Sequence, residues 1–205
     1  MQLRPHQEKA IQAMLRHDKG QVIVPTGGGK TICMIHDAIE QFKSDRLKTI
    51  VVVAPRILLA NQLCEEFLEF IDNVDVLHVH SGETHHQSTT KSQVIEEWAW
   101  ASKKHQLIFT TYHSLHKIQD ATAMLPDTVY FDEAHNATQK NFIEAVEHHS
   151  MYVVRNFFFT ATPKHSYTPF KVGMNDTDIF GGVICNVGAP KLVKQGYILP
   201  PKVKI

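Results

Sequence analysis

The sequence has little of several features that mark specialised protein classes. Its three cysteines are odd in number and scattered, which argues against a disulfide scaffold and favours a reducing compartment. The 10 glycines and 9 prolines are too few for a collagen-like or low-complexity chain. The longest apolar run, 50–55, is too short to span a bilayer, and no apolar stretch follows the first charged residues as a signal peptide would require. We therefore expect neither a membrane protein nor a secreted one.

Charge of one sign is also missing. The chain has 21 basic and 21 acidic side chains, so its formal net charge is zero. No global basic field indicates a nucleic-acid partner, and any such site must be a local strip. The 205 residues, 43% of them hydrophobic, suit one domain with a substantial core.

Short apolar, β-rich runs alternate with segments of helical periodicity. This alternation predicts an α/β fold with a mainly parallel sheet and helices on both faces. Ligands in such sheets bind at the carboxyl ends of the strands, so functional motifs are expected directly after strands. The expected strands are 21–24, 49–54, 74–79, 107–111, 128–131 and 156–160, and the expected helices are 31–42, 57–70, a short one near Leu115, 139–149 and 189–195, the last ended by Gly196 in a left-handed conformation.

Two stretches fit this alternation poorly. Residues 81–93 are polar and rich in histidine, which predicts an exposed loop, and residues 163–180 predict an irregular excursion. The histidines show no zinc-ligand spacing with a second pair, so we expect no metal site among them. Trp98 and Trp100 are expected to pack, and Phe157–Phe159 to lie in the core.

A glycine-rich segment follows the first expected strand and precedes a helix. It ends in an intact Gly-Lys-Thr and nearly fits the phosphate-loop pattern, with Val24 where that pattern usually has glycine. Glycines let backbone N–H groups face phosphates, and the following helix points its positive end at them. Lys30 would reach the β- and γ-phosphates, and the Thr31 hydroxyl would ligate Mg²⁺. The alternative is an ordinary glycine-rich turn before Lys-Thr.

An apolar strand, 128–131, runs directly into Asp132 and Glu133, about a hundred residues after the phosphate loop. Adjacent carboxylates repel each other, and a cation between them and the phosphates would relieve that cost. Asp132 would hold Mg²⁺, and Glu133 would orient and polarise the attacking water. Alone, Asp-Glu at a strand end is often only a helix start. Together with the phosphate loop, it indicates an ATPase.

With these motifs placed, the sequence resembles the first RecA-like ATP-binding domain of superfamily-2 helicases and translocases. The similarity is to the DEAH-box type, near restriction-enzyme motor subunits and DNA-repair or phage helicases. It implies a RecA-like P-loop NTPase fold that binds ATP with Mg²⁺. The implied nucleotide-binding residues are Arg4 and Gln7, with Gln7 on the adenine edge, and the phosphate-loop residues Pro25, Thr26, Gly27, Gly28, Gly29, Lys30 and Thr31.

The resemblance also assigns roles further along the chain. Asp132 to His135 matches motif II, which makes Lys30, Asp132, Glu133 and His135 the implied catalytic set. Thr160 and Thr162 match the motif that couples the nucleotide site to nucleic acid, often through the motif II histidine. The residues implied to touch the phosphodiester backbone are Arg56, Gln62, Ser81, Gly82 and Thr111.

The resemblance implies a partner domain as well. In the family a second RecA-like domain or subunit supplies an arginine finger, and residues 200–205 resemble the start of a linker toward it. We therefore expect residues 1–199 to form the ATP-binding domain, with weak turnover by itself. Analogy favours DNA over RNA as the partner, and a cytoplasmic setting in a bacterial or phage-infected cell. The alternatives are a non-motor nucleotide-binding module that needs a partner and, less well supported, another phosphate-loop enzyme such as a kinase.

Overall fold

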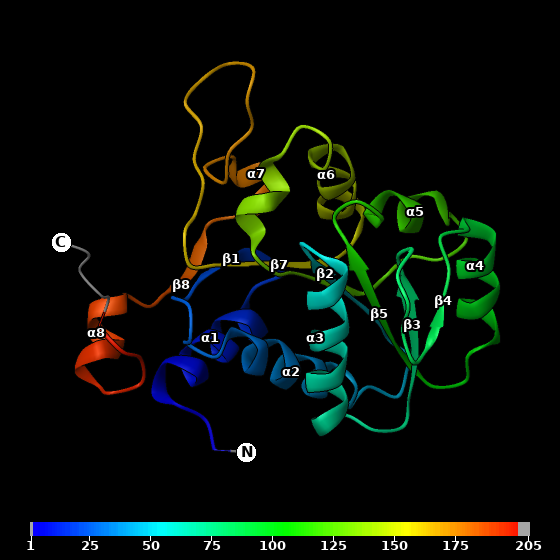
Figure 1. Ribbon diagram of the computed structural model, residues 1–205, viewed down its shortest axis with the longest axis horizontal. Coiled ribbons are helices and arrows are strands. Elements are labelled where there is room, and N and C mark those ends of the chain that lie inside the picture. The colour runs from blue at the N-terminus through cyan, green and yellow to red at the C-terminus, as the bar shows by residue number, and fades with distance from the viewer. Residues whose placement is uncertain (1, 201–205) are drawn as a thin grey trace.

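An eight-stranded, entirely parallel sheet runs through the centre of the computed structural model, which describes residues 2–200 (Figure 1). The strand order is β4-β3-β5-β2-β6-β7-β1-β8. Because every strand runs in the same direction, all the loops that leave carboxyl ends meet at one edge. The strands are β1 (Lys19–Ile23), β2 (Thr49–Ala54), β3 (Val74–Val79), β4 (Gln87–Ser88), β5 (His105–Thr111), β6 (Thr128–Phe131), β7 (Arg155–Thr160) and β8 (Val183–Asn186).

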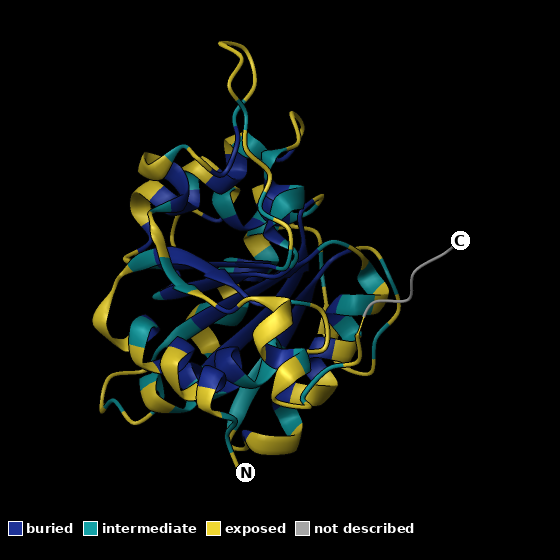
Figure 2. Ribbon diagram, turned by 90° about the vertical axis from the view of Figure 1, so that its left-hand side faces the viewer, coloured by how far each residue is buried: buried dark blue, intermediate teal, exposed yellow. Residues whose placement is uncertain are grey.

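Helices cover both faces of the sheet and bury its strands (Figures 1 and 2). One face packs against α1 (Pro5–Arg16), α2 (Lys30–Gln41) and α3 (Ile57–Phe70). The opposite face packs against α4 (Ser92–Ala101), α5 (Leu115–Asp120) and α6 (Ile143–Tyr152). The remaining helical segments are short: the 3-10 helix η1 (Ala134–Thr138), α7 (Thr177–Phe180) and α8 (Ala189–Lys194). The expected RecA-like α/β fold is confirmed.

The two apolar layers explain the continuous apolar runs of the sequence. Alternate residues of a strand point to opposite faces, so a strand buried on both sides can be apolar at successive positions. In β7, Phe157 and Phe159 join the α1–α3 layer while Phe158 joins the other, and all three are fully buried. The prediction that the three phenylalanines lie in the core is confirmed.

Several expected boundaries are wrong. The helix predicted at 139–149 begins only at Ile143, because the chain first forms η1 and a turn after the acidic motif. The segment 81–93 is not all loop, since it includes β4 and the start of α4, which we did not predict. Strand β8 was missed because it is a short edge strand that pairs only with β1. Gly196 does adopt the predicted left-handed conformation, with φ +78°.

The tryptophans of α4 behave differently from each other. Trp98 packs against the core layer and is confirmed as a packing residue. Trp100 is 77% exposed, so the expectation that it packs is wrong. A helix turns by 100° per residue, so two residues apart cannot both face the sheet.

A buried ionic network ties both helical and strand elements together far from the motif-bearing edge. Asp37 of α2 is fully buried and receives both guanidinium nitrogens of Arg155 at 2.7 and 2.8 Å. The Tyr130 hydroxyl also donates to Asp37. Burial lowers the pKa of Arg155, but attraction to Asp37 more than compensates, so its pKa is raised. The network therefore holds a buried carboxylate with all its partners supplied by β6 and β7.

Acid is expected to destabilise the fold through His149. This side chain is 2% exposed and its Nδ1 bonds the Ala145 carbonyl oxygen at 2.8 Å. Burial lowers its pKa to about 4. In the unfolded chain the histidine has its ordinary pKa of about 6.5 and takes up a proton there. The folded state takes up that proton only near pH 4, so the free energy of unfolding falls as the pH drops from about 6.5 to about 4. The contribution of His149 is roughly 3 kcal/mol.

Urea unfolding at pH 7, 5.5 and 4 measures this effect, with His149→Gln as the variant. The variant is expected to lose less stability between pH 7 and pH 4 than the unmodified protein does. His17→Gln is the matched control, because His17 bonds its own helix carbonyl at 2.7 Å but is exposed. An identical pH dependence in all three proteins would contradict the prediction.

Candidate nucleotide-binding site

The candidate site residues gather along the edge formed by the carboxyl ends of the strands. The glycine-rich loop leaves β1, the acidic pair leaves β6, and Thr160 ends β7, which lies between them. The start of the loop is tied to β7 by a hydrogen bond from the Val24 N–H to the Thr160 carbonyl at 3.1 Å. Segments separated by more than a hundred residues thus become neighbours because the sheet order differs from the chain order.

Two glycines shape the loop itself. Gly27 and Gly29 have φ values of +82° and +79°, which side chains rarely adopt. A Cβ on Gly29 would also lie 2.2 Å from Nε2 of Gln7. Val24, which departs from the usual pattern, is buried in the core layer of α1–α3, so the exception is accommodated by packing.

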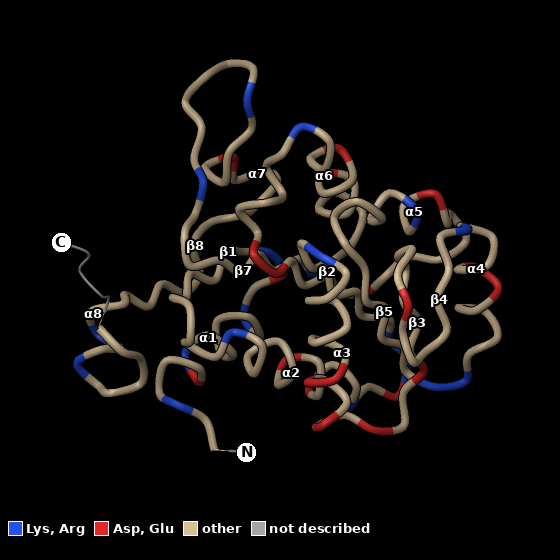
Figure 3. Tube along the Cα trace, viewed as in Figure 1, with Lys and Arg blue, Asp and Glu red and all other residues tan. Residues whose placement is uncertain are grey.

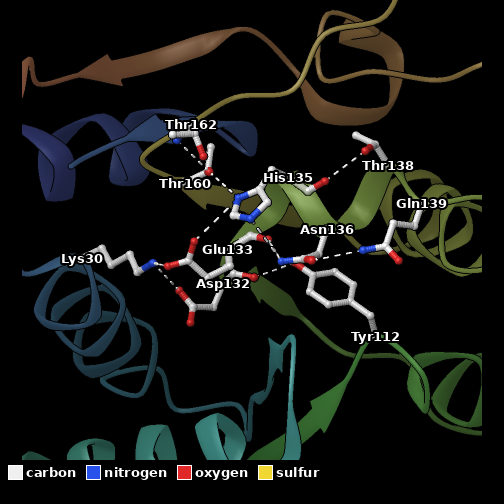
Figure 4. A network of polar contacts seen from close by, with 10 residues as sticks. All are labelled: Lys30, Tyr112, Asp132, Glu133, His135, Asn136, Thr138, Gln139, Thr160 and Thr162. Carbon is white, nitrogen blue, oxygen red and sulfur yellow. Dashed lines mark hydrogen bonds and ion pairs between the residues drawn. The ribbon is translucent and has the colours of Figure 1, made fainter. Parts of the chain in front are cut away.

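Lys30 stands between the loop and the acidic pair (Figure 4). Its ammonium lies 3.1 Å from Oδ1 of Asp132 and donates a hydrogen bond to Oε1 of Glu133. Burial lowers the pKa of Lys30, but the two carboxylates outweigh that effect and its pKa is raised. Lys30 is therefore a fixed cation at the start of α2, held by anionic oxygens.

Asp132 is the more buried of the two carboxylates. Its side chain is 7% exposed, and burial raises its pKa although Lys30 lowers it. Oδ1 is buried and accepts no hydrogen bond from residues 2–200, having only the ionic contact with Lys30. The Tyr112 hydroxyl donates to the Asp132 carbonyl at 2.7 Å and fixes the backbone there.

This donor set fits Mg²⁺. The ion prefers hard oxygen ligands and is usually bound by one or two carboxylates, and Asp132 offers an oxygen with no hydrogen-bond donor. Thr31 follows Lys30 in α2, and the Lys30 ammonium lies 3.1 Å from Oδ1 of Asp132. Asp132 and the Thr31 hydroxyl are thus the residues that could hold the cation.

Glu133 is held in an uncommon backbone conformation. Its φ and ψ are +46° and +54°, in the left-handed region where a residue with a side chain is strained. The Asn136 backbone N–H and side-chain amide both donate to the Glu133 carbonyl, at 3.0 and 2.9 Å. These bonds hold the turn that aims the Glu133 carboxylate toward Lys30 (Figure 4).

A chain of polar contacts leads from Glu133 to the end of β7. Nδ1 of His135 lies 3.6 Å from Oε2 of Glu133 and 2.9 Å from Oγ1 of Thr160. The backbone N–H of Thr162 in turn donates to Oγ1 of Thr160 at 3.1 Å. The structure therefore joins the predicted catalytic carboxylate to both predicted coupling threonines.

The N-terminal residues pack onto the phosphate loop. Gln7 donates from Nε2 to the Gly29 carbonyl at 3.2 Å and accepts the Arg4 backbone N–H at 2.9 Å. His6 bonds the Gly28 carbonyl at 2.6 Å. Sequence reasoning missed His6, although its place beside Gln7 was a signal.

Tyr197 was missed too. Its ring lies 5.0 Å from the Arg4 guanidinium carbon and 5.6 Å from the His6 ring. No local pattern marks it, because it meets Arg4 only when the chain beyond α8 folds back onto α1.

The five residues predicted to contact nucleic acid come from the segments at the carboxyl ends of β2, β3 and β5. Thr111 ends β5, Gln62 lies within α3, and the other three are in the turns after β2 and β3. Arg56 begins α3 and is exposed, as are Gln62 and Ser81, while Gly82 is half-buried. Thr111 is only 3% exposed at the end of β5, so its side chain offers little surface, and its assignment remains a prediction. Among residues 2–200, basic residues are spread along the trace (Figure 3).

This arrangement on an all-parallel sheet is that of a RecA-like domain of superfamily-2 helicases. Residues 1–165 match the protein family described as Type III restriction enzyme, res subunit. Because this match spans well over half of the sequence, the chain belongs to that family. The family supports a helicase-type ATPase domain with a hydrolase kind of activity.

Solved structures share the fold. A nuclease-deletion mutant of the Type ISP restriction-modification enzyme LlaGI, in complex with a DNA substrate mimic, is 22% identical with a TM-score of 0.81 over 96% of this chain. The Hef helicase domain of Pyrococcus furiosus is 20% identical with a TM-score of 0.60 over 87% of this chain and 37% of its own. The UvsW helicase of bacteriophage T4 is 15% identical with a TM-score of 0.59, over 89% of this chain and 60% of its own.

The chain spans 21% of the length of the LlaGI structure. No curated protein sequence matches the chain significantly. Within residues 2–200, no helix has the length and apolarity needed to cross a bilayer. In the same range, no three His, Cys, Asp or Glu side chains gather as a metal site.

Proposed function

We propose that this domain binds Mg-ATP and couples its hydrolysis to movement on, or unwinding of, nucleic acid, with DNA as the favoured partner. One observation carries the proposal: the Lys30 ammonium faces Asp132 and Glu133 across the end of β7, and a polar chain runs on to Thr160. A protein that kept this fold only for a structural role would not need these linked catalytic side chains.

The residues of the site would act as follows. Lys30 would exchange its carboxylate partners for phosphate oxygens. The backbone N–H groups of residues 26–31 would bind phosphate oxygens as well. Thr31 and Asp132 would hold Mg²⁺, which when bound neutralises charge that develops on the phosphates. Glu133, freed from Lys30, would orient the attacking water and accept its proton. Arg4 and Gln7 would hold the adenine end.

Thr160 is suited to couple ATP hydrolysis to the contact with nucleic acid. Its hydroxyl contacts His135 and Thr162, and its carbonyl accepts the N–H of Val24 at the start of the phosphate loop. A shift of the loop or of Glu133 on hydrolysis would therefore be transmitted to the end of β7. Small movements of this kind drive larger domain movements in switching proteins.

The partner assignment rests on neighbouring loops and on analogy. The five residues proposed to contact nucleic acid end or follow β2, β3 and β5, at the edge that carries the candidate nucleotide site. They are Arg56, Gln62, Ser81, Gly82 and Thr111. Hydroxyls and backbone N–H groups grip phosphates without reading sequence. The LlaGI structure was solved with a DNA substrate mimic, which supports DNA by fold-level analogy.

The proposal includes a second RecA-like domain or subunit that supplies an arginine finger. Such a finger is worth several powers of ten in turnover in related ATPases. Residues 1–199 would be the ATP-binding domain, and of the proposed linker at 200–205 all but residue 200 lie outside the described residues. We therefore expect the 205-residue chain to bind ATP but to turn it over slowly.

ATP binding and hydrolysis by the purified chain test the proposal. Both are measured with and without single- and double-stranded DNA, with Lys30→Ala as the variant that removes the phosphate-binding cation. Nucleotide binding that is lost in Lys30→Ala, with slow turnover, is the expected result. Lys9→Ala on α1 is the control, since Lys9 is exposed and outside the proposed site.

Other outcomes separate the alternatives. Fast, DNA-stimulated turnover that depends on Lys30 would mean that self-association of the chain supplies an arginine finger. ATP binding with no hydrolysis even when a second RecA-like domain is supplied would favour a non-motor nucleotide-binding module. Equal ATP binding by the unmodified chain and by Lys30→Ala would overturn the nucleotide site.

A further inference from the structure

A large cavity lies between α3 and the segment 81–88 that leads from β3 to β4. Its volume is about 790 Å³, within the range of small-molecule sites. The cavity is lined by three of the residues predicted to contact a nucleic-acid strand: Gln62, Ser81 and Gly82. The lining also contains Asn61 of α3, His78 of β3, and His85 and His86 of the polar segment, none of which the nucleotide site uses.

His78 occupies a position where the strand pattern calls for an apolar side chain. Val74 and Val76 of β3 pack in the α1–α3 layer, and His78 is next on that face. It is fully buried, and its ring stacks on Phe109 at 5.5 Å between centroids. Burying a polar ring in an apolar layer is costly unless its nitrogens are paired.

The hydrogen bonds around His78 decide which nitrogen carries its proton. The Gly82 N–H donates to Nδ1 of His80 at 3.1 Å, so Nδ1 of His80 is an acceptor. Neutral His80 therefore carries its proton on Nε2 and donates it to Nδ1 of His78 at 3.1 Å. Burial lowers the pKa of His78 to about 4, which keeps it neutral with its proton on Nε2.

Two buried polar atoms of the cavity lining are left without partners within residues 2–200. One is Nε2 of His78, a donor by the preceding argument, and the other is Oδ1 of Asn61, an acceptor. The Asn61 amide is held in place by its donation to the Glu83 carbonyl at 3.1 Å. An unpaired buried donor or acceptor is destabilising, so a ligand that supplies one acceptor and one donor would pair both.

The remaining lining selects the kind of ligand. Glu65 and Glu83 line the cavity, and no lysine or arginine of the described chain does. A phosphate would be repelled there, which favours an uncharged group. The His86 ring lies nearly parallel to that of His78, 12° between planes and 5.7 Å between centroids, and is exposed. Such a ring is a surface on which a planar group can stack.

We propose that this cavity binds one unpaired nucleobase of a nucleic-acid strand whose backbone lies outside the cavity, toward the exposed Arg56 at the start of α3. A nucleobase carries an acceptor for His78 and a donor for Asn61. It is also planar, so it can stack on the ring of His86, and it is uncharged. The proposal rests on the proposed nucleic-acid function and adds to it a base contact beside the backbone contacts. Base contacts of this type give a protein some preference for sequence or for unpaired strands.

Single-stranded DNA in which one position at a time lacks its base tests the proposal. Affinities are measured by fluorescence anisotropy for the intact strand and for each abasic strand. Stacking and pairing of one base are worth about tenfold in affinity, so one abasic position is expected to weaken binding by about that factor. The other positions should have smaller effects.

Two variants connect that loss to the cavity. In Asn61→Ala and His86→Ala the intact strand should bind about as weakly as the abasic strand binds the unmodified protein. In each variant, removing the base at that position should weaken binding no further, because the substitution and the missing base remove the same interaction. Gln93→Ala on α4 is the matched control and should bind as the unmodified chain does. Thermal unfolding checks that the variants are folded.

The outcomes separate this proposal from the function it rests on. Tight strand binding that is equally sensitive to all abasic positions, or unaffected in both variants, would overturn the base site but leave the function standing. Binding of a free nucleoside monophosphate as tight as that of the strand would overturn its assignment to a strand. No binding of any strand, with ATP binding intact, would overturn both.

Discussion

Glu133→Gln is expected to slow the hydrolysis of bound ATP by about 10²–10⁴-fold, the usual contribution of a positioned general base. The amide keeps the size of the side chain but cannot accept a proton from water. Nucleotide affinity should be unchanged or tighter, because the ion pair between Lys30 and Glu133 would no longer compete with phosphates. Single-turnover hydrolysis with protein in excess over ATP measures the chemical step even where turnover is slow.

The control for this variant is Glu144→Gln on α6. Glu144 is an exposed acid outside the candidate site, so its replacement should leave hydrolysis unchanged. If Glu133→Gln hydrolysed ATP as fast as the unmodified chain, another group would have to be the base. If it lost nucleotide binding instead, Glu133 would have a role in building the site.

Asp37→Ala is expected to lower the free energy of unfolding by about 3–5 kcal/mol, because it leaves the Arg155 guanidinium buried without its anion. Asp37 is fully buried and accepts hydrogen bonds from Arg155 and Tyr130. Such a loss is a large share of the stability of a typical domain. Urea unfolding at pH 7 measures it.

Two comparisons make that result interpretable. Arg46→Ala removes an ion pair with Asp127 of the same 2.7 Å length, but Arg46 is 68% exposed, so its loss should cost only about 0–1 kcal/mol. The double variant Asp37→Leu with Arg155→Met should recover much of the stability, since apolar residues replace the whole pair. A loss in Asp37→Ala no greater than that in Arg46→Ala would contradict the prediction.

The gathering of the candidate nucleotide-site motifs at one edge could be predicted from the sequence because each motif is local. The run from Pro25 to Thr31 contains both the glycines that need positive φ and the lysine that follows them. Asp132 and Glu133 adjoin one another at the end of an apolar strand. Parallel strands place all such loops at one edge, so predicting the strands was enough to bring these motifs together.

Predictions failed where packing outweighed local preference. The sequence predicts a helix over 139–149, yet the left-handed turn at Glu133, its bonds to Asn136 and η1 delay that helix until Ile143. The short strands β4 and β8 lie at the two edges of the sheet, where a few residues suffice to pair and little apolar pattern is required. Trp98 and Trp100 differ because only one of them can face the sheet.

The sequence by itself determined the fold class, the phosphate loop, the acidic pair and the family resemblance, since these depend on residue order and periodicity. Only the tertiary structure decided which distant side chains meet. Asp37 and Arg155 are 118 residues apart and pair because β7 lies beside the α2 layer. Tyr197 reaches Arg4, and His78 and Asn61 face one cavity. Such contacts follow from how helices pack on the sheet, and no local pattern records that packing.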